Sequence, residues 1–184
     1  MQNLVQDLLS YSRISTRRET FAEIELQDVI KDVLSDLEIS IQESNATVEI
    51  DPLPFIDADP LQMHQLFLNL IGNGMKYRRD GVAPLIKINA EVMDNGRPGA
   101  NDSSSKVCRI QISDNGIGFE QKYAEQIFII FQRLHGRDKY TGTGVGLAIC
   151  QKIILRHGGL IEAKSNPGEG AAFTITLPVH HVPF

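Results

Sequence analysis

Two asparagines and a lysine recur at helical spacing in the segment NLIGNGMKY, residues 69–77. At about 100° per residue, Asn69, Asn73 and Lys76 fall on one narrow stripe of a helix. Such carboxamides and an ammonium group can hold phosphate oxygens and a hydrated Mg²⁺, which needs few protein oxygens when a nucleotide supplies the rest. A solvated helix face without a role remains the alternative interpretation. The adjoining face is apolar and consists of Met63, Phe67, Leu70, Ile71 and Gly74.

The motif DNGIGF, residues 114–119, directly follows a stretch with the alternation of a strand. The carboxylate of Asp114, at the end of that strand, can accept a hydrogen bond from an exocyclic amine. Gly116 and Gly118 let the backbone approach a flat ring, because they carry no side chain. The same letters are also typical of a plain Asp-Asn-Gly turn, so the motif alone does not indicate a ligand.

A glycine-rich segment, GTGVGL at residues 142–147, opens an apolar helical pattern. Free backbone N–H groups and the helix dipole make a helix N-terminus a binding site for phosphate. The spacing is GxGxG rather than GxGxxG, no strand pattern precedes it, and the sequence contains no GxxxxGK[ST]. These features exclude a Rossmann motif and a P-loop. Glycines that merely open a helix remain the alternative.

Residues 128–133, FIIFQR, carry two phenylalanines three positions apart, ahead of the polar run LHGRDKY. Phe128 and Phe131 can anchor one end of a loop, and Arg133 can meet phosphates when that loop closes. A short helix that packs both rings into the core is the alternative. We expect residues 132–143 to form a lid that is mobile without nucleotide, because polar residues and glycines bury little there.

The chain has 184 residues, is 42% hydrophobic and carries a net charge of −5. This length fits one domain, or one domain with a short appendage. No apolar run reaches the roughly 18 residues of a membrane span, no signal peptide is recognisable, and the acidic balance argues against nucleic acid. Cys108 and Cys150 lie in apolar segments without a CxxC pattern, which predicts reduced core thiols in a cytoplasmic protein and no metal cage.

Hydrophobic periodicity predicts the elements that position these motifs. Helices are expected at 1–16, 27–43, 60–77 and 144–157, the last apolar nearly all round and therefore buried. Strands are expected at 21–26, 47–50, 55–56, 85–93, 106–113, 160–164 and 172–177, with a polar hairpin loop at 94–105 and the turn GEGAAF at 168–173. Helices and strands mix without strict alternation, so we predict an α+β sandwich with helices on one face of a mixed sheet.

The order of the motifs is more specific than any one of them. An asparagine helix, DNGIGF, two spaced phenylalanines, GTGVGL and GEGAAF, in this order, resemble the nucleotide-binding boxes of the sensor histidine kinase ATP-binding domain. The resemblance covers about residues 21–178, and the segment 131–147 is similar to bacterial kinases of the phytochrome- and PAS-linked type. It implies the two-layer α/β sandwich, or Bergerat fold, of the GHKL ATPases, which gyrase-type ATPases and the heat-shock-90 chaperone share.

The resemblance also implies roles for individual residues, with ATP and Mg²⁺ as ligands. Asn73 would ligate Mg²⁺, while Asn69 and Lys76 would face the phosphates as the other members of the catalytic group. Asp114 would bind the adenine amino group, with Gly116 and Gly118 beneath the ring. The other expected nucleotide contacts are Tyr77, Phe131, Arg133, Gly142, Thr143, Gly144, Val145, Gly146 and Leu147.

The same resemblance divides the chain and implies its partners. Residues 1–20 resemble the end of the second helix of a dimerisation and histidine-phosphotransfer hairpin with its linker, and residues 21–184 the catalytic domain. None of the five histidines stands in the S-H-E-x-R-x-P context of a phosphoacceptor. The γ-phosphoryl group of ATP would pass to a histidine on a hairpin absent from this chain, and then to the receiver domain of a response regulator. The full-length protein would be a homodimer, and we expect this segment to contact neither nucleic acid nor membrane.

A GHKL-type ATPase and an inactive nucleotide-sensing module are the alternatives to a kinase. Such an ATPase would use a glutamate as general base one helical turn before the asparagine that ligates Mg²⁺. That position is Asn69, which cannot accept a proton near neutral pH, so phosphoryl transfer is favoured over hydrolysis. The presence of all the boxes argues against an inactive module. Gly74 departs from the alanine usual in the family, which we expect to loosen the helix by about 1 kcal/mol.

Overall fold

The computed structural model describes residues 2–16, 21–94, 106–134, 140 and 142–180. Its described strands form a five-stranded mixed sheet in the order β2-β4-β5-β7-β6 and a two-stranded sheet of β1 and β3. The strands are β1 (Ala22–Glu25), β2 (Thr47–Ile50), β3 (Phe55–Ala58), β4 (Leu85–Asp94), β5 (Lys106–Asp114), β6 (Leu160–Asn166) and β7 (Gly170–Pro178). Only the β2–β4 pair in these sheets is parallel.

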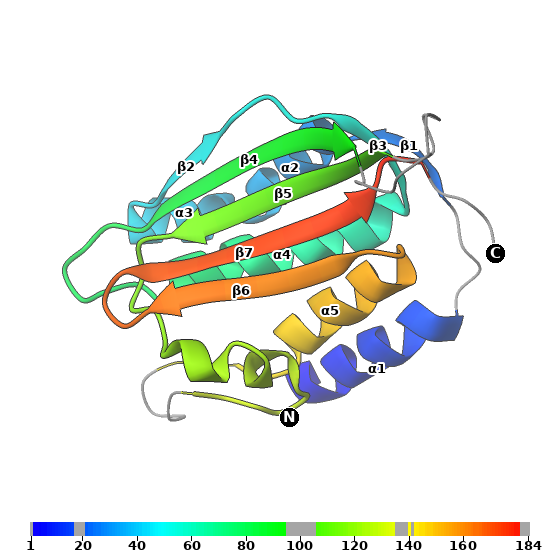
Figure 1. Cartoon of the computed structure of the whole chain (residues 1–184). Coiled ribbons are helices and arrows are strands. Elements are labelled where there is room, and N and C mark those ends of the chain that lie inside the picture. Colours follow the sequence, from blue (N-terminus) through cyan, green and yellow to red (C-terminus); the bar gives the residue numbers. More distant parts are fainter. Residues whose placement is uncertain (1, 17–20, 95–105, 135–139, 141, 181–184) are drawn as a thin grey trace.

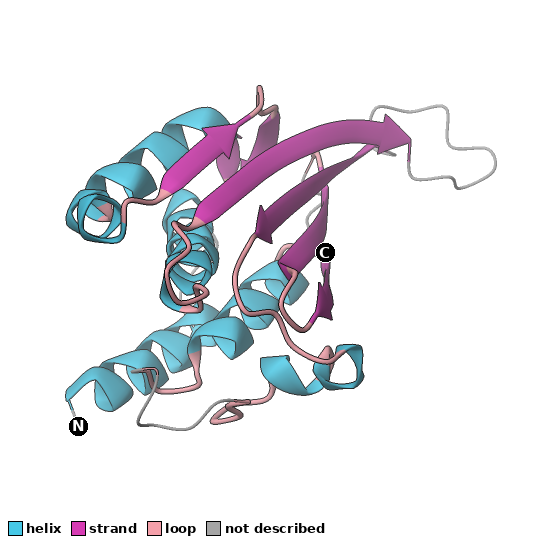
Figure 2. Cartoon of the chain, turned by 90° about the vertical axis from the view of Figure 1, so that its left-hand side faces the viewer, coloured by secondary structure: helices cyan, strands magenta, loops and turns pink. Residues whose placement is uncertain are grey.

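The helices cover one face of the five-stranded sheet, and no helix of the described residues lies on the other face (Figures 1 and 2). They are α1 (Gln2–Thr16), α2 (Leu26–Asp36), α3 (Glu38–Ser44), α4 (Pro60–Lys76) and α5 (Gly146–Arg156), with short 3₁₀ turns η2 (Gln121–Tyr123) and η3 (Gln126–Phe128). The core lies between the sheet and α2, α4 and α5, and includes fully buried side chains such as Leu26, Ile30, Phe67, Leu70, Ile86, Ile110 and Ile149. The predicted α+β sandwich with helices on one face is confirmed.

Helix α4 is the element that positions the asparagine stripe. The carboxylate of Asp59 caps it by accepting hydrogen bonds from the N–H groups of Leu61 and Gln62, at 3.0 and 3.2 Å, and Pro60 occupies its first turn. A Cβ at Gly74 would lie 3.1 Å from Cγ1 of Ile86 and 3.3 Å from Cβ of Asp114. The glycine therefore lets α4 lie close against the sheet. The expectation that glycine loosens the helix did not include this packing role.

The prediction of one continuous helix over residues 27–43 is wrong, because two helices occupy this stretch. It is divided at Leu37, whose φ of −94° and ψ of 3° end α2 before α3 begins. Helix α2 buries Leu26, Val29, Ile30 and Val33, whereas none of the residues of α3, all of which are described, is buried. The apolar spacing continues across the division, so periodicity alone could not locate it.

The helix predicted for residues 144–157 begins later, at Gly146, and is not buried all round. Its buried side chains are Ala148, Ile149, Cys150, Ile153 and Ile154, whereas Leu155 is 61% exposed. The side chain of Leu155 remains in solvent because the helices and the sheet that pack against α5 do not cover that side. An apolar composition was here a poor guide to complete burial.

Helix α1 packs along α5 (Figure 1). The ammonium of Lys152 donates a hydrogen bond to the carbonyl of Tyr11 at 2.9 Å and lies 3.9 Å from the centre of the Tyr11 ring. Ile14 is buried against the same body. The helix expected near the N-terminus is therefore present, while the expected linker and the loop between β4 and β5 fall at residues 17–20 and 95–105, outside the described part of the chain.

Among the described helices, none is long and apolar enough to cross a lipid bilayer. The two cysteines, Cys108 and Cys150, are both buried and unbridged, as predicted. Burial raises the pKa of Cys108 to about 11 and that of Cys150 to about 12. Both thiols are therefore protonated at neutral pH and unreactive while the chain is folded.

Candidate functional site

Two adjoining pockets form one groove where the C-terminal part of α4 meets the start of α5. They hold about 630 and 590 Å³ of space, in each case open to solvent on one side. Both pockets are lined by Asn73, Tyr77, Ile127, Gln132 and Leu147. The shared lining makes the groove continuous, with a largely apolar end at the sheet and a polar end at the start of α5.

The end of the groove at the sheet is built around Asp114. Its Oδ1 accepts hydrogen bonds from the N–H groups of Gly116 and Ala171, at 2.8 and 3.3 Å. Burial raises the pKa of Asp114, an effect that these two N–H groups partly oppose. Both hydrogen bonds that described residues make to this carboxylate end on Oδ1, so Oδ2 is available to accept a hydrogen bond from a ligand's amino group.

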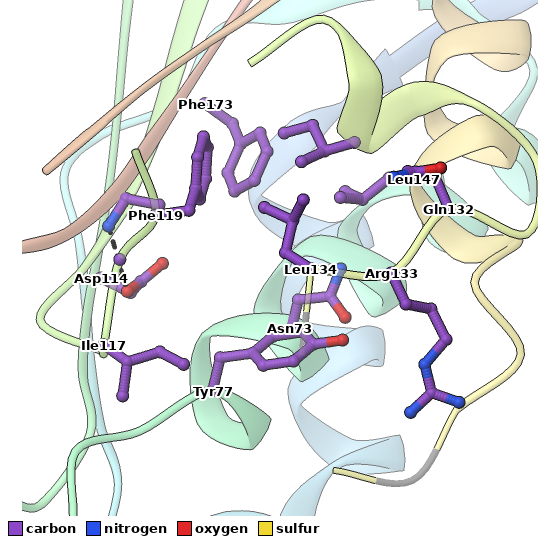
Figure 3. Close-up of a pocket in the computed structure, with 13 residues that line it drawn as sticks. Asn73, Tyr77, Asp114, Ile117, Phe119, Gln132, Arg133, Leu134, Leu147 and Phe173 are labelled. Carbon is purple, nitrogen blue, oxygen red and sulfur yellow. Dashed lines mark hydrogen bonds between the residues drawn. The ribbon is translucent and has the colours of Figure 1, made fainter. Parts of the chain in front are cut away.

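Apolar side chains surround this carboxylate. The pocket is lined there by Ile117, Phe119, Ile127, Leu134, Leu147 and Phe173. Figure 3 shows the rings of Phe119 and Phe173 side by side, with Asn73 and Tyr77 across the pocket from them. A flat apolar ring with one exocyclic donor matches such a site, because the walls favour the ring and Asp114 fixes its orientation.

The polar end of the groove brings together the three residues of the predicted stripe. Asn69, Asn73 and Lys76 line it with Gly142, Thr143, Gly144 and Gly146. A Cβ at position 142 would lie 2.5 Å from Nζ of Lys76, and one at position 146 would lie 3.2 Å from Oδ1 of Asn69. The glycines thus leave room for the Lys76 ammonium and the Asn69 carboxamide oxygen beside the start of α5.

The start of α5 offers backbone N–H groups to the same end of the groove. No side chain in the described parts of the chain caps this helix at Val145. Uncapped N–H groups, the helix dipole and the Lys76 ammonium together form an environment suited to phosphate. The side chain of Val145 itself is fully buried in the core, so the contact predicted for this residue is limited to its backbone.

The guanidinium of Arg133, predicted to meet phosphates when the lid closes, binds backbone carbonyls in this structure. Its Nη1 donates to the carbonyl of Gly142 at 2.7 Å, and its Nη2 donates to the carbonyl of Tyr140. In Figure 3 its guanidinium points away from Asp114 and the centre of the pocket. In this state Arg133 holds the backbone that leads into the glycine segment instead of facing a ligand.

The ring of Phe131 does not pack into the core. The ring is 55% exposed, the residue has a φ of 66°, and its N–H donates to the carbonyl of Gly144 at 2.9 Å. Phe128, by contrast, is buried. The alternative interpretation, a short helix that packs both rings into the core, is therefore wrong for Phe131, which contacts the glycine segment through its backbone. Half of the predicted lid, residues 135–139 and 141, lies outside the described residues.

The remaining predicted residues lie in or beside the groove. Tyr77 lines both pockets, its ring centre 5.0 Å from that of Tyr140 and 4.6 Å from the Lys76 ammonium. Gly118 lines the pocket at the sheet, and Gly116 bonds Asp114 there. Sequence reasoning missed several lining residues, namely Ile117, Phe119, Ile127, Gln132, Leu134, Ala171 and Phe173. Five of them, Ile117, Phe119, Gln132, Ala171 and Phe173, stood in recognised motifs, and there without a role.

The fold is an α/β sandwich with an apolar pocket that ends at a buried carboxylate. Next to this pocket, amide and lysine side chains line an end suited to phosphate. Together these features define a nucleotide-binding domain of the GHKL class. The chain belongs to the family of histidine kinase-, DNA gyrase B- and HSP90-like ATPases, whose model matches residues 58–181. Within that family it is an ATP-binding catalytic domain of the histidine kinase type.

Relatives and solved structures agree with this assignment. The chain is 41% identical to the phytochrome-like protein Cph1 of Synechocystis sp., over 97% of this chain and 22% of Cph1. The histidine kinase ThkA, in complex with the response regulator protein TrrA, matches with a TM-score of 0.70 and 25% identity over 97% of this chain and 47% of that chain. Full-length ShkA in complex with AMPPNP shares the fold, with a TM-score of 0.76 and 24% identity over 98% of this chain and 36% of ShkA. The chain thus spans about a fifth of the length of Cph1.

Proposed function

We propose that this domain transfers the γ-phosphoryl group of Mg²⁺-bound ATP to a histidine on a dimerisation hairpin. Helix α1 would be the C-terminal end of the second helix of that hairpin. From the histidine the phosphoryl group passes to an aspartate of a response-regulator receiver domain. The kinase relatives, and the ThkA structure in complex with a response regulator, support this proposal. The observation that carries it is the meeting of the Asn69, Asn73 and Lys76 stripe with the glycine segment at one end of the groove.

The donor set fits a magnesium ion that ATP largely holds itself. Asn73 offers one carboxamide oxygen to the groove, and the described residues contain no group of three His, Cys, Asp or Glu side chains able to hold a metal alone. Mg²⁺ keeps several waters and accepts one or two protein oxygens beside phosphate oxygens. Asn73 would hold the ion, which when bound neutralises charge on the phosphates.

The chain's own residues bind and orient the nucleotide. Asp114 accepts a hydrogen bond from the adenine amino group, the apolar walls exclude water from the ring, and Lys76 with the N-terminal amides of α5 neutralises phosphate oxygens. Asn69 lies beside the phosphate end but has no proton-accepting group for an attacking water. Among the described residues that line this end of the groove, none is a carboxylate or a histidine that could serve as general base, which favours transfer to an incoming imidazole over hydrolysis.

The proposal divides the chain into two parts. Residues 1–20 are the end of the hairpin with its linker, and residues 21–184 are the catalytic domain. Helix α1 exposes the apolar side chains Leu4, Val5, Leu8 and Leu9, as a helix cut from a hairpin bundle would. We propose that the full-length protein is a homodimer through this hairpin and that the domain works in the cytoplasm, where ATP is available. One helix of about 16 residues buries too little apolar surface for a stable dimer, so the chain alone should be largely monomeric.

The deciding experiment supplies the histidine separately. The chain is incubated with radiolabelled ATP, Mg²⁺ and the hairpin domain of its parent kinase, and acid-labile label on the hairpin is measured. We expect labelling of the hairpin, none on the chain alone, and loss of labelling in Asn73→Ala. Binding of ATP without any labelling, or rapid hydrolysis by the chain alone, would contradict the kinase assignment and favour a nucleotide-sensing module or an ATPase, respectively.

A further inference from the structure

The pocket loop, which we define as residues 114–119, is held from two sides. On one side, the N–H of Ile117 donates to the carbonyl of Tyr77 at 2.8 Å, at the end of α4. On the other side, the turn between β6 and β7 contacts it, where the N–H of Gly168 donates to the carbonyl of Ile117 at 2.7 Å. The loop that carries Asp114 and Phe119 thus depends on a hairpin that contributes few side chains to the groove.

Ser165, on β6, is the side chain that joins this hairpin to the loop. Its Oγ accepts a hydrogen bond from the N–H of Phe119 at 2.8 Å and donates one to the carbonyl of Gly170 at 2.6 Å. The residue is only 8% exposed, so water has little access to replace either hydrogen bond. One hydroxyl therefore satisfies a donor on the loop and an acceptor on β7 at the same time.

The strand beneath Ser165 is itself fixed by Gln121. The carboxamide of Gln121 accepts from the N–H of Ser165 at 3.0 Å and donates to the carbonyl of Ala163 at 3.1 Å. In this way a side chain from η2 pairs with β6, the edge strand of the sheet, as a neighbouring strand would. Ser165 is consequently held in place from the side opposite to β7.

The neighbourhood leaves the loop little room to move. A Cβ at Gly118 would lie 2.1 Å from the carbonyl oxygen of Asn166 and 2.9 Å from Oγ of Ser165. The loop backbone therefore lies directly against the hairpin at Gly118, and Phe119, the next residue, forms a wall of the pocket. A shift at Phe119 would move both that wall and the backbone beside Asp114.

We infer that Ser165 is a positioning residue for adenine recognition, acting through the Phe119 N–H to hold the pocket loop against the β6–β7 hairpin. The inference rests on the nucleotide binding that the proposed function requires. Without the hydroxyl, the N–H of Phe119 and the carbonyl of Gly170 lose their buried partner, which is costly in a site with little access to water. The loop then samples other positions, and adenine loses more affinity than a base that Asp114 does not recognise.

The test compares Ser165→Ala with Thr176→Val in the full chain. Thr176 lies on β7 opposite Leu160, far along the strand from the loop, so its variant removes a hydroxyl from the same sheet without touching the pocket. Calorimetry with ADP and GDP in Mg²⁺ gives affinity and base discrimination, and hydrogen exchange of residues 115–120 reports on the loop. Thermal unfolding without nucleotide verifies that each variant folds.

For Ser165→Ala we expect ADP affinity about tenfold lower, in line with the loss of a buried hydrogen-bond partner, a lower ADP-to-GDP affinity ratio, and faster exchange at residues 115–120. Thr176→Val should match the unmodified chain in all three. A Ser165→Ala variant with unchanged exchange in the loop, or with a lower melting temperature but unchanged base discrimination, would overturn the inference. If the unmodified chain bound neither nucleotide, the proposed function would fail and adenine recognition with it, and faster loop exchange would then support only that Ser165 holds the pocket loop.

Discussion

The tight contact between Gly118 and the β6–β7 hairpin makes Gly118→Ala an informative substitution. Gly118 has a φ of 61°, and a Cβ there would lie 2.1 Å from the Asn166 carbonyl oxygen and 2.8 Å from that of Gly170. Real Cβ atoms do not approach backbone oxygens this closely, so either the loop or the hairpin must move. Gly81 provides a matched control, since its φ is 74° and nothing lies within 4 Å of its Cβ position.

Two contributions determine the expected loss of stability. A left-handed backbone costs alanine about 1–2 kcal/mol relative to glycine, at either position. At Gly118 the displaced loop also loses the hydrogen bonds from Gly168 to Ile117 and from Phe119 to Ser165, at about 1 kcal/mol or more each. We therefore expect a loss of about 4 kcal/mol for Gly118→Ala and about 1–2 kcal/mol for Gly81→Ala.

Urea unfolding followed by circular dichroism measures both losses. For a chain of this size each kcal/mol corresponds to about 2–4 °C in melting temperature, so thermal scans should separate the two variants clearly. ADP affinity should fall in Gly118→Ala and stay unchanged in Gly81→Ala. Equal destabilisation of the two variants would show that the loop and hairpin relax at little cost, and would refute the steric reasoning.

Three further predictions concern other parts of the molecule. Burial raises the pKa of Asp114, so the carboxylate proposed to bind adenine becomes protonated at a higher pH than an exposed aspartate does. Calorimetry should show that the ADP affinity of the unmodified chain falls as the pH decreases through that pKa. In Asp114→Asn the ADP affinity should be weak and independent of pH. An ADP affinity that does not change with pH in the unmodified chain would count against the role of this carboxylate. Cys108 and Cys150 should resist iodoacetamide at neutral pH until urea unfolds the chain, because burial raises their pKa to about 11 and about 12; rapid labelling of the native chain would contradict their burial. Lys152→Ala should speed hydrogen exchange in α1 several-fold without changing ADP affinity, because it removes contacts with Tyr11 that are worth about 1 kcal/mol. Unaltered exchange would show that other contacts hold α1.

The asparagine stripe could be predicted because its geometry is local. Asn69, Asn73 and Lys76 share a face through the periodicity of one helix, and the apolar residues beside them determine which side of α4 is buried. The lining of the groove by all three follows from that pattern. The same reasoning located the strands of the sheet, whose alternation depends only on neighbouring residues.

The contacts around the pocket loop could not be predicted in this way. The N–H of Ala171 reaches Asp114 across 57 positions, and Ser165 reaches Phe119 across 46. Backbone donors leave no trace in residue type, so neither pairing has a signal in a single sequence. The positive φ of Phe131 and the hydrogen bonds of Arg133 to loop carbonyls likewise depend on the path of the loop rather than on side-chain chemistry.

The place of β7 within the sheet has a consequence for how the protein is made. This strand follows all the others in the sequence, yet it lies between β5 and β6 and supplies the N–H that Ala171 donates to Asp114. On the ribosome, β6 therefore emerges before its only neighbour in the described sheet, and no nucleotide pocket exists until β7 has been synthesised and inserted. Because chains are made at about 5–20 residues per second, the unfinished sheet exposes strand edges for seconds, an interval in which nucleotide cannot stabilise it. Nucleotide stabilises only the completed fold, so a chain truncated before β7 should be degraded however much ATP is present.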